Sequence, residues 1–226
     1  MKCRILPAVL RLRMRGVCSQ DYYEKPNYME DGLGETETYW DARLTPAGEE
    51  QSAGLAKQVQ QLQASGVSID LVAVSPLTRA IQTASIGFAS PRPPFVSTSL
   101  CRERVWTHQC DRRRSRAILE GEFPWVDFSQ IQPGEDEMWD AQKENMPHPQ
   151  NSTACRARGV RFLDWLWARP ESSIAVVSHW MFLQHLFSHY PEDEELNANW
   201  TNAELRTVTL LRRSPEETPT GSKEEL

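Results

Sequence analysis

The chain has 226 residues, enough for one domain with a sizeable hydrophobic core, and a formal net charge of −6 at pH 7. The negative charge argues against a broad nucleic-acid-binding surface, and no apolar run is long enough to cross a membrane. The five cysteines form no CxxC pair, so the sequence predicts neither a metal site nor a disulfide framework and fits a reducing compartment.

The first twenty residues are basic, and no acidic side chain occurs before Asp21. Within them, the apolar run from Val9 to Leu12 is a candidate first strand. The next segment, from Asp21 to Asp41, is polar, rich in Tyr and Glu, and contains two glycines. This composition predicts a loop near the mouth of a site.

A helix is predicted to begin at Thr45. The Thr45 hydroxyl can cap it, Pro46 suits its first position, and Gly66 ends it. Its apolar stripe recurs at helical spacing: Leu55, Val59 and Leu62.

The stretch SPLTRAIQTA, residues 75–84, follows an apolar run from Ile69 to Val74 that predicts a buried strand. Ser75 can cap the next helix, Pro76 suits its first turn, and Arg79 falls in that turn. Free backbone N–H groups and a guanidinium at one helix start form a candidate anion site of phosphate type. The alternative is an ordinary strand-to-helix turn with a surface arginine.

A further strand is predicted from Phe95 to Leu100, and it leads to Glu103. Beyond it, Asp111 can cap a helix that carries the basic triplet 112–114. The triplet is interpreted either as a solvated helix face or as a group that reaches the negative end of a substrate. Glu103 likewise has a second interpretation, as an ordinary member of a surface Arg-Glu-Arg run.

The second half of the chain predicts an excursion over the sheet from Gln130 to Gln150 and a helix from Ala154 to Trp167. A final strand is predicted from Leu205 to Leu211, and the polar tail 214–226 is expected to be disordered. The apolar residues of the helix expected to face inward are Val160, Leu163 and Trp167.

The run Ile174–Val177 predicts another buried strand, closed by Ser178 and His179 and followed by an apolar helix pattern. Ligands of open α/β sheets bind at the carboxyl edge of the strands. If this strand and the one before Ser75 are parallel neighbours, Arg79 and His179 share that edge. Together, these patterns predict a single three-layer α/β/α sandwich with a mostly parallel central sheet.

Several motifs jointly resemble the histidine phosphatase superfamily, also called phosphoglycerate mutase-like. The resemblance covers most of the chain. Of the motifs given next, CRERVWTHQCDRRRS and EFPWVDFS narrow it to a branch of small eukaryotic phosphoglycerate mutase-like proteins. The motifs are LTPAGEEQ (44–51), SPLTRAIQTA (75–84), IAVVSH (174–179), CRERVWTHQCDRRRS (101–115) and EFPWVDFS (122–129).

The resemblance implies a covalent phosphohistidine mechanism without metal or cofactor. It places Arg79 and His179 in a pocket for the phosphoryl oxygens and makes Glu103 the acid that protonates the leaving oxygen. Cationic groups neutralise the charge of a transferring phosphoryl group, and a partly buried glutamate with a raised pKa can supply the proton.

The chain departs from the family pattern where the nucleophile belongs. Aligning Gly16 with the loop glycine of the family places Leu12 and Arg13 at the positions of its Arg-His pair. Arginine stays protonated and has no lone pair with which to attack phosphorus. Residues 1–20 are therefore interpreted as a first strand with an altered loop, a mitochondrial presequence, or a wrong or alternative first exon. Residues 21–213 form the expected phosphoglycerate mutase-like domain.

Two functions follow. One is a phosphomonoesterase, expected in the cytoplasm or alternatively in mitochondria, that acts on a small phosphorylated metabolite or a phosphoprotein. The other is a catalytically inactive relative that binds phosphorylated ligands or partner proteins. Arg79, Glu103 and His179 favour the first function, whereas Arg13 favours the second.

Overall fold

The computed structural model describes residues 6–7, 9–10, 39–105, 108–140, 150–190, 192–197 and 202–210. Leu12, Arg13 and Gly16 lie outside the described residues, as do most of the loop before Asp41 and the tail 214–226.

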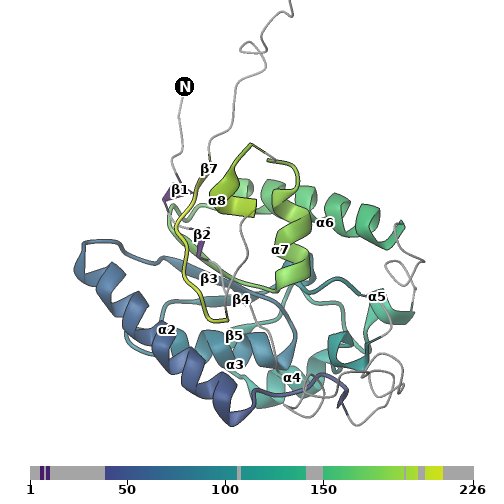
Figure 1. Cartoon of the computed structure of the whole chain (residues 1–226). Helices are drawn as coiled ribbons and strands as arrows, with labels where there is room; N and C mark the ends of the chain where they lie inside the picture. Colours follow the sequence, from purple (N-terminus) through teal and green to yellow (C-terminus); the bar gives the residue numbers. More distant parts are fainter. Residues whose placement is uncertain are drawn as a thin grey trace, which may run out of the picture.

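Parallel strands form the central sheet of the part of the chain that is described (Figure 1). Their order is β2-β6-β3-β4-β5, and every neighbouring pair is parallel. A separate antiparallel pair joins β1 to β7. The strands are β1 (Leu6–Pro7), β2 (Val9–Leu10), β3 (Leu71–Val74), β4 (Phe95–Ser97), β5 (Val126–Asp127), β6 (Ile174–Val177) and β7 (Thr209–Leu210).

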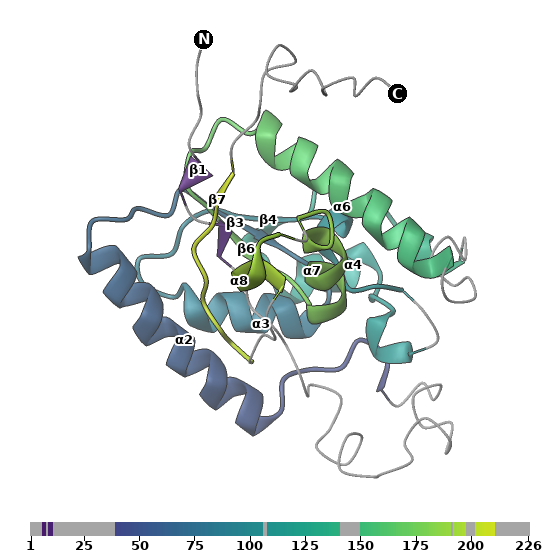
Figure 2. The same cartoon turned by 45° about the horizontal axis from the view of Figure 1, so that its top comes forward.

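Helices cover both faces of this sheet (Figures 1 and 2). The α-helices are α2 (Pro46–Ala64), α3 (Thr78–Gly87), α4 (Arg116–Glu122), α5 (Glu137–Asp140), α6 (Gln150–Ala168), α7 (Trp180–Phe187) and α8 (Glu194–Asn197). Two 3₁₀ turns, η3 (Ser99–Cys101) and η4 (Gln109–Asp111), lie between β4 and α4.

Alternation along β3 divides the core into two layers. Val72 and Val74 pack with residues of α2 and α3, whereas Leu71 and Ala73 pack with residues of α6 and α7. Successive side chains of a strand point to opposite faces, so a strand that is apolar throughout is covered on both sides. The predicted three-layer α/β/α architecture is confirmed.

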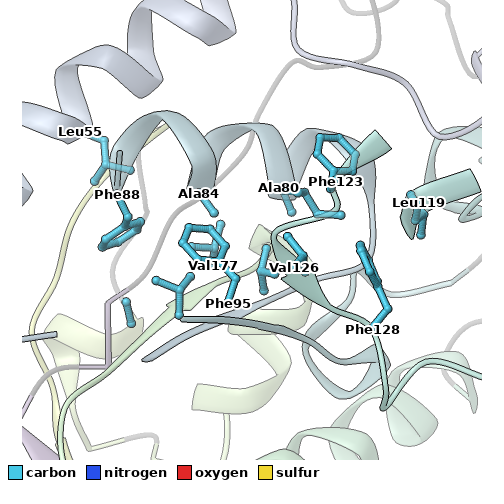
Figure 3. Packing of buried hydrophobic residues seen from close by; sticks show 14 of the residues in the cluster. Leu55, Ala80, Ala84, Phe88, Phe95, Leu119, Phe123, Val126, Phe128 and Val177 are labelled. Atoms are coloured by element: carbon cyan, nitrogen blue, oxygen red, sulfur yellow. The ribbon is translucent and has the colours of Figure 1, made fainter. Parts of the chain in front are cut away.

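Figure 3 shows the first of these layers, in which side chains of α2 and α3 meet those of the strands. Leu55 and Ala84 come from the helices, and Phe95 and Val177 come from β4 and β6. Each of these side chains is at most 2% exposed. Burial of a large apolar side chain contributes roughly 1.5–3 kcal/mol, so this layer supports the strands whose ends carry the site.

The predicted capping of α2 agrees with the structure. The Thr45 hydroxyl accepts a hydrogen bond from the Gly48 amide at 3.2 Å, and Pro46 is the first helical residue. The chain leaves the helix through Gly66, whose φ of +95° favours glycine over other residues.

The predicted start of α3 is wrong by two residues. Leu77 is still extended, with φ −75° and ψ 133°, so α3 begins at Thr78. The Ser75 hydroxyl accepts from the Leu77 amide within the turn and does not cap the helix. The strand predicted over 95–100 also ends early, at Ser97, where the chain enters η3.

Two predictions in the second half need correction. No helix follows Asp111, because Arg112 is extended with φ −87° and ψ 117°, and α4 begins only at Arg116. Val160 of α6 is 44% exposed and does not face the core, which α6 reaches through Phe162 and Leu166 instead.

Gly87 allows α3 to approach α2 closely. A Cβ at this position would lie 2.3 Å from Cδ2 and 3.0 Å from Cγ of the fully buried Leu55. Gly87→Ala is expected to lower the free energy of unfolding by about 1–3 kcal/mol, as overpacking does. Urea unfolding followed by circular dichroism measures this change.

The matched control is Gly54→Ala, because Gly54 lies within α2 and an added Cβ there meets nothing within 4 Å. This variant is expected to gain about 0.5–1 kcal/mol from helix propensity. A Gly87→Ala protein as stable as the wild type would show that the contact between α2 and α3 tolerates a methyl group.

Candidate active site

The register of β3 and β6 sets the position of the site. Val74 is paired with Val177 in the parallel ladder, and the Ser75 amide donates to the Val177 carbonyl at 3.0 Å. The residues that follow the two strands therefore emerge side by side at one edge of the sheet. Arg79 in the first turn of α3 and His179, which precedes α7, meet at this edge.

Arg79 is 6% exposed, and its guanidinium is surrounded by acceptors. Nη1 donates to the Cys110 carbonyl at 2.5 Å, and Nη2 donates to Oδ1 of Asp111 at 2.7 Å. Nη2 also lies 3.4 Å from Nδ1 of His179. Arg79 and His179, which lie 100 residues apart in the chain, are thus direct neighbours.

His179 is fully buried, and its Nε2 lies 2.8 Å from the Ser75 hydroxyl oxygen. A guanidinium can only donate, so Nδ1 is the acceptor toward Arg79 and Nε2 carries the proton that faces Ser75. Burial, and next the charge of Arg79, lowers the pKa of His179 well below its ordinary value. The imidazole is therefore neutral in this arrangement.

Glu103 lies at the N-terminus of α7. Its Oε1 accepts from the amides of Phe182 at 2.9 Å and Arg104 at 2.8 Å. Burial raises the pKa of the Glu103 carboxyl to about 7, the charge of Asp111 adds to the rise, and these hydrogen bonds together with Arg79 oppose it. The carboxyl can therefore carry a proton near neutral pH.

A buried ion pair holds the loop that carries Glu103. Arg102 and Asp136 are both fully buried and are joined by two bonds, of 2.6 and 2.8 Å. Burial disfavours the Asp136 carboxylate, yet Arg102 lowers the pKa of this group below its ordinary value. Asp136 also accepts a hydrogen bond from the Arg113 amide at 2.9 Å, so the ion pair connects the segment of Arg102 to that of Arg113.

Arg113 corrects the interpretation of the basic triplet as a solvated helix face. Its side chain is fully buried. The guanidinium donates to the carbonyls of Gly134 at 3.0 Å and Glu135 at 2.7 Å, and to the Glu137 carboxylate at 2.5 Å. The middle member of the triplet therefore ties the segment before α5 to the chain that follows η4.

Arg158 of α6 supports the same loop. Its guanidinium donates to the carbonyls of Arg102 at 2.8 Å and Glu103 at 3.0 Å. It also lies over the Phe182 ring, 4.8 Å from the centroid. The backbone on both sides of Glu103 is thereby tied to α6 and α7.

Asp41 supplies the cap that α3 lacks locally. Its carboxylate accepts from the Thr78 amide at 2.8 Å and the Thr78 hydroxyl at 2.7 Å. Arg114 donates to the same carboxylate at 3.2 Å. A negative charge at a helix N-terminus is favourable, so Asp41 secures the turn that presents Arg79.

The structure brings together the predicted residues Arg79, His179 and Glu103, whereas Arg13 lies outside the described residues. Asp111 is a partner of Arg79 that the sequence pattern does not predict. Its position after Cys110, in a motif already assigned to the family, was the available signal. Asp41 and the contact between Ser75 and His179 carried no comparable local signal.

Neither a metal site nor a membrane span is present in the described part of the chain. No three His, Cys, Asp or Glu side chains gather there in a way that could hold a metal ion. None of its helices combines the length and the apolar character needed to cross a bilayer.

Comparisons with known proteins agree with the fold and the motifs. Residues 34–219 match the model of the histidine phosphatase superfamily (branch 1). The chain is 36% identical over 213 residues to the phosphoglycerate mutase-like protein of Arabidopsis thaliana, covering 79% of this chain and 76% of that one. It is 34% identical over 212 residues to phosphoglycerate mutase-like protein 1 of the same plant, covering 78% and 72%.

A solved structure shows the same fold. Mycobacterial hydrolase 1 superposes with a TM-score of 0.51 at 16% identity and covers 92% of this chain and 91% of that one. At this identity the likeness concerns the arrangement of helices and strands.

The raised pKa of Glu103 makes stability depend on pH. A carboxyl whose pKa is higher in the folded state binds more protons when folded, so its contribution is complete at low pH and falls as the pH rises. The free energy of unfolding of the wild type minus that of Glu103→Gln should decrease between about pH 4.5 and about pH 7 and then stay constant.

Urea unfolding at a series of pH values measures this difference. Glu50→Gln, which removes an exposed glutamate of α2, controls for the loss of one acidic side chain. A difference that increases with pH across this range would contradict a protonated Glu103.

Proposed function

The chain belongs to the histidine phosphatase superfamily, and on that premise we propose that it is a phosphomonoesterase of the phosphohistidine type. Its substrate would be a small phosphorylated metabolite or a phosphoprotein. The observation that carries the proposal is the contact of Arg79 with His179 at the carboxyl edge of β3 and β6, beside Glu103, which binds an amide in the first turn of α7.

Arg79 would neutralise the charge of the phosphoryl oxygens. Its guanidinium comes from the first turn of α3, and it is shielded from solvent, where a charge-assisted hydrogen bond is strong. His179 lies against the guanidinium and would contact the same group. The transferring phosphoryl group needs this stabilisation because charge is spread over its equatorial oxygens.

Glu103 would act as the general acid. A carboxyl that is partly protonated near pH 7 can give its proton to the departing alkoxide oxygen and remain as a carboxylate. The amides of α7 that already contact Glu103 would stabilise this carboxylate. Activity that depends on this proton is expected to decline above neutral pH.

The residue at the position of the nucleophile distinguishes two candidate functions. The proposed alignment on Gly16 puts Arg13 at the position of the family's nucleophilic histidine, and a guanidinium cannot form a phosphohistidine. This substitution favours a second candidate function, in which the chain binds phosphorylated ligands or partner proteins without turning them over. The two candidates share the anion site and differ in turnover.

Turnover of p-nitrophenyl phosphate separates the two candidates. The wild type is expected to be slower than an active relative by several powers of ten, because the remaining groups only stabilise charge and position water. The double variant Leu12→Arg/Arg13→His should be faster than the wild type. Adding His179→Ala to it should remove the gain.

The outcomes lead to different conclusions. Robust wild-type turnover that survives His179→Ala would contradict the assignment of the site. An inert double variant that still binds phosphate would leave the binding function and reject the alignment of Arg13 with the nucleophile.

Binding of inorganic phosphate tests the anion site without turnover. Arg79→Ala should weaken binding at least about tenfold, since a charge-assisted hydrogen bond contributes roughly 1.5–3 kcal/mol. Isothermal titration calorimetry measures this change. Arg161→Ala removes an exposed arginine of α6 and should leave the affinity unchanged. Equal affinities of the wild type and Arg79→Ala would contradict the site.

A further inference from the structure

We propose that Asp111 is a positioning residue, which holds the Arg79 guanidinium in the orientation that an anionic ligand requires. The sequence pattern predicts only a helix-capping role for Asp111, and in the structure Arg112 is extended and no helix begins there. The inference rests on the proposed anion site and adds a residue to it.

The guanidinium is held at two points by neighbouring residues of one short turn. The carbonyl of Cys110 accepts from Nη1, and the carboxylate of Asp111 accepts from Nη2. Two acceptors on two different nitrogens of a planar group determine both its position and its rotation about the end of the side chain. Without the Asp111 carboxylate, Nη2 would keep the longer 3.4 Å contact with Nδ1 of His179, which holds that rotation less firmly.

The turn itself is anchored. The Asp111 carbonyl accepts a hydrogen bond from Nη2 of Arg102, and the Asp111 amide donates to the His108 carbonyl at 2.9 Å. Arg102 is in turn fixed by its buried bidentate pair with Asp136. The Asp111 carboxylate therefore projects from a backbone that has little freedom to move.

Burial gives Asp111 two separable effects on Arg79. The two side chains are 7% and 11% exposed, so the carboxylate neutralises a guanidinium that is largely removed from water. Its negative charge opposes the binding of an anion. Its acceptor oxygen favours binding, because a flexible arginine that is ordered in advance loses less conformational freedom when the ligand arrives.

Two substitutions distinguish these effects. Asp111→Asn removes the charge and keeps an acceptor oxygen in the same place, whereas Asp111→Ala removes both. Because both variants lose the same charge, a difference between them reports the positioning of Arg79. Asp111→Leu is close to Asn in shape and lacks the acceptor, so it provides the same comparison if Asp111→Ala does not fold.

Isothermal titration calorimetry with inorganic phosphate tests the proposal. Asp111→Ala should bind phosphate about threefold to tenfold more weakly than Asp111→Asn, the range expected when one flexible side chain must be ordered on binding. In an Arg79→Ala background the two substitutions should give equal affinities. Asp164→Asn and Asp164→Ala, at an exposed position of α6, should match one another.

Several outcomes would overturn the proposal. Equal affinities of Asp111→Asn and Asp111→Ala, both above the wild type, would show that Asp111 acts only as a counter-charge. Equal and unchanged affinities with lower melting temperatures would show a structural role alone. A difference that persists without Arg79 would show that Asp111 acts elsewhere.

Failure of the underlying site gives a different pattern. If phosphate does not bind the wild type, or binds it as well as Arg79→Ala, the proposed function and this inference are both rejected. If Arg79 matters and the Asp111 variants are equal, the site stands and only the positioning role is rejected.

Discussion

The buried ion pair between Arg102 and Asp136 holds the segment on which the candidate site depends. Two parallel bonds join the side chains, and neither is exposed to solvent. Desolvating such a pair is costly, so it need not add stability, but breaking it would leave a buried charge unpaired. The ion pair instead sets the geometry of the site. Arg102 also binds the Asp111 carbonyl and so determines where the Asp111 side chain lies.

The charges around Arg79 form a balanced set. Asp111 neutralises the guanidinium, His179 is neutral because burial and nearby arginines disfavour its protonation, and Glu103 can hold a proton near neutral pH. A balanced site avoids the large penalty of an isolated buried charge. It also means that an incoming phosphoryl group would redistribute charge among existing partners and would not enter a strongly cationic pocket.

Membership of the superfamily and the proposed loss of a covalent nucleophile concern different parts of the chain. Arg79, His179 and Glu103 belong to elements that the family match covers, within residues 34–219. Arg13 precedes that range. Anion binding by the described groups does not require a nucleophile, since it depends on charge and hydrogen-bond donors. Turnover by the phosphohistidine mechanism does require a nucleophile. The two candidate functions therefore share the anion site and differ in turnover.

The sequence by itself determined the strands that precede Arg79 and His179, because each is a short apolar run ended by a turn signal. Parallel pairing of these strands then places both residues at one edge, so their proximity could be predicted. Only the tertiary structure decided what surrounds them. Asp111 and Asp41 bind groups 32 and 37 residues away in the chain, and Arg113 is buried by carbonyls of a distant loop. Local patterns do not show which distant group an aspartate will bind, and the carbonyls that bury Arg113 are backbone groups that every residue possesses.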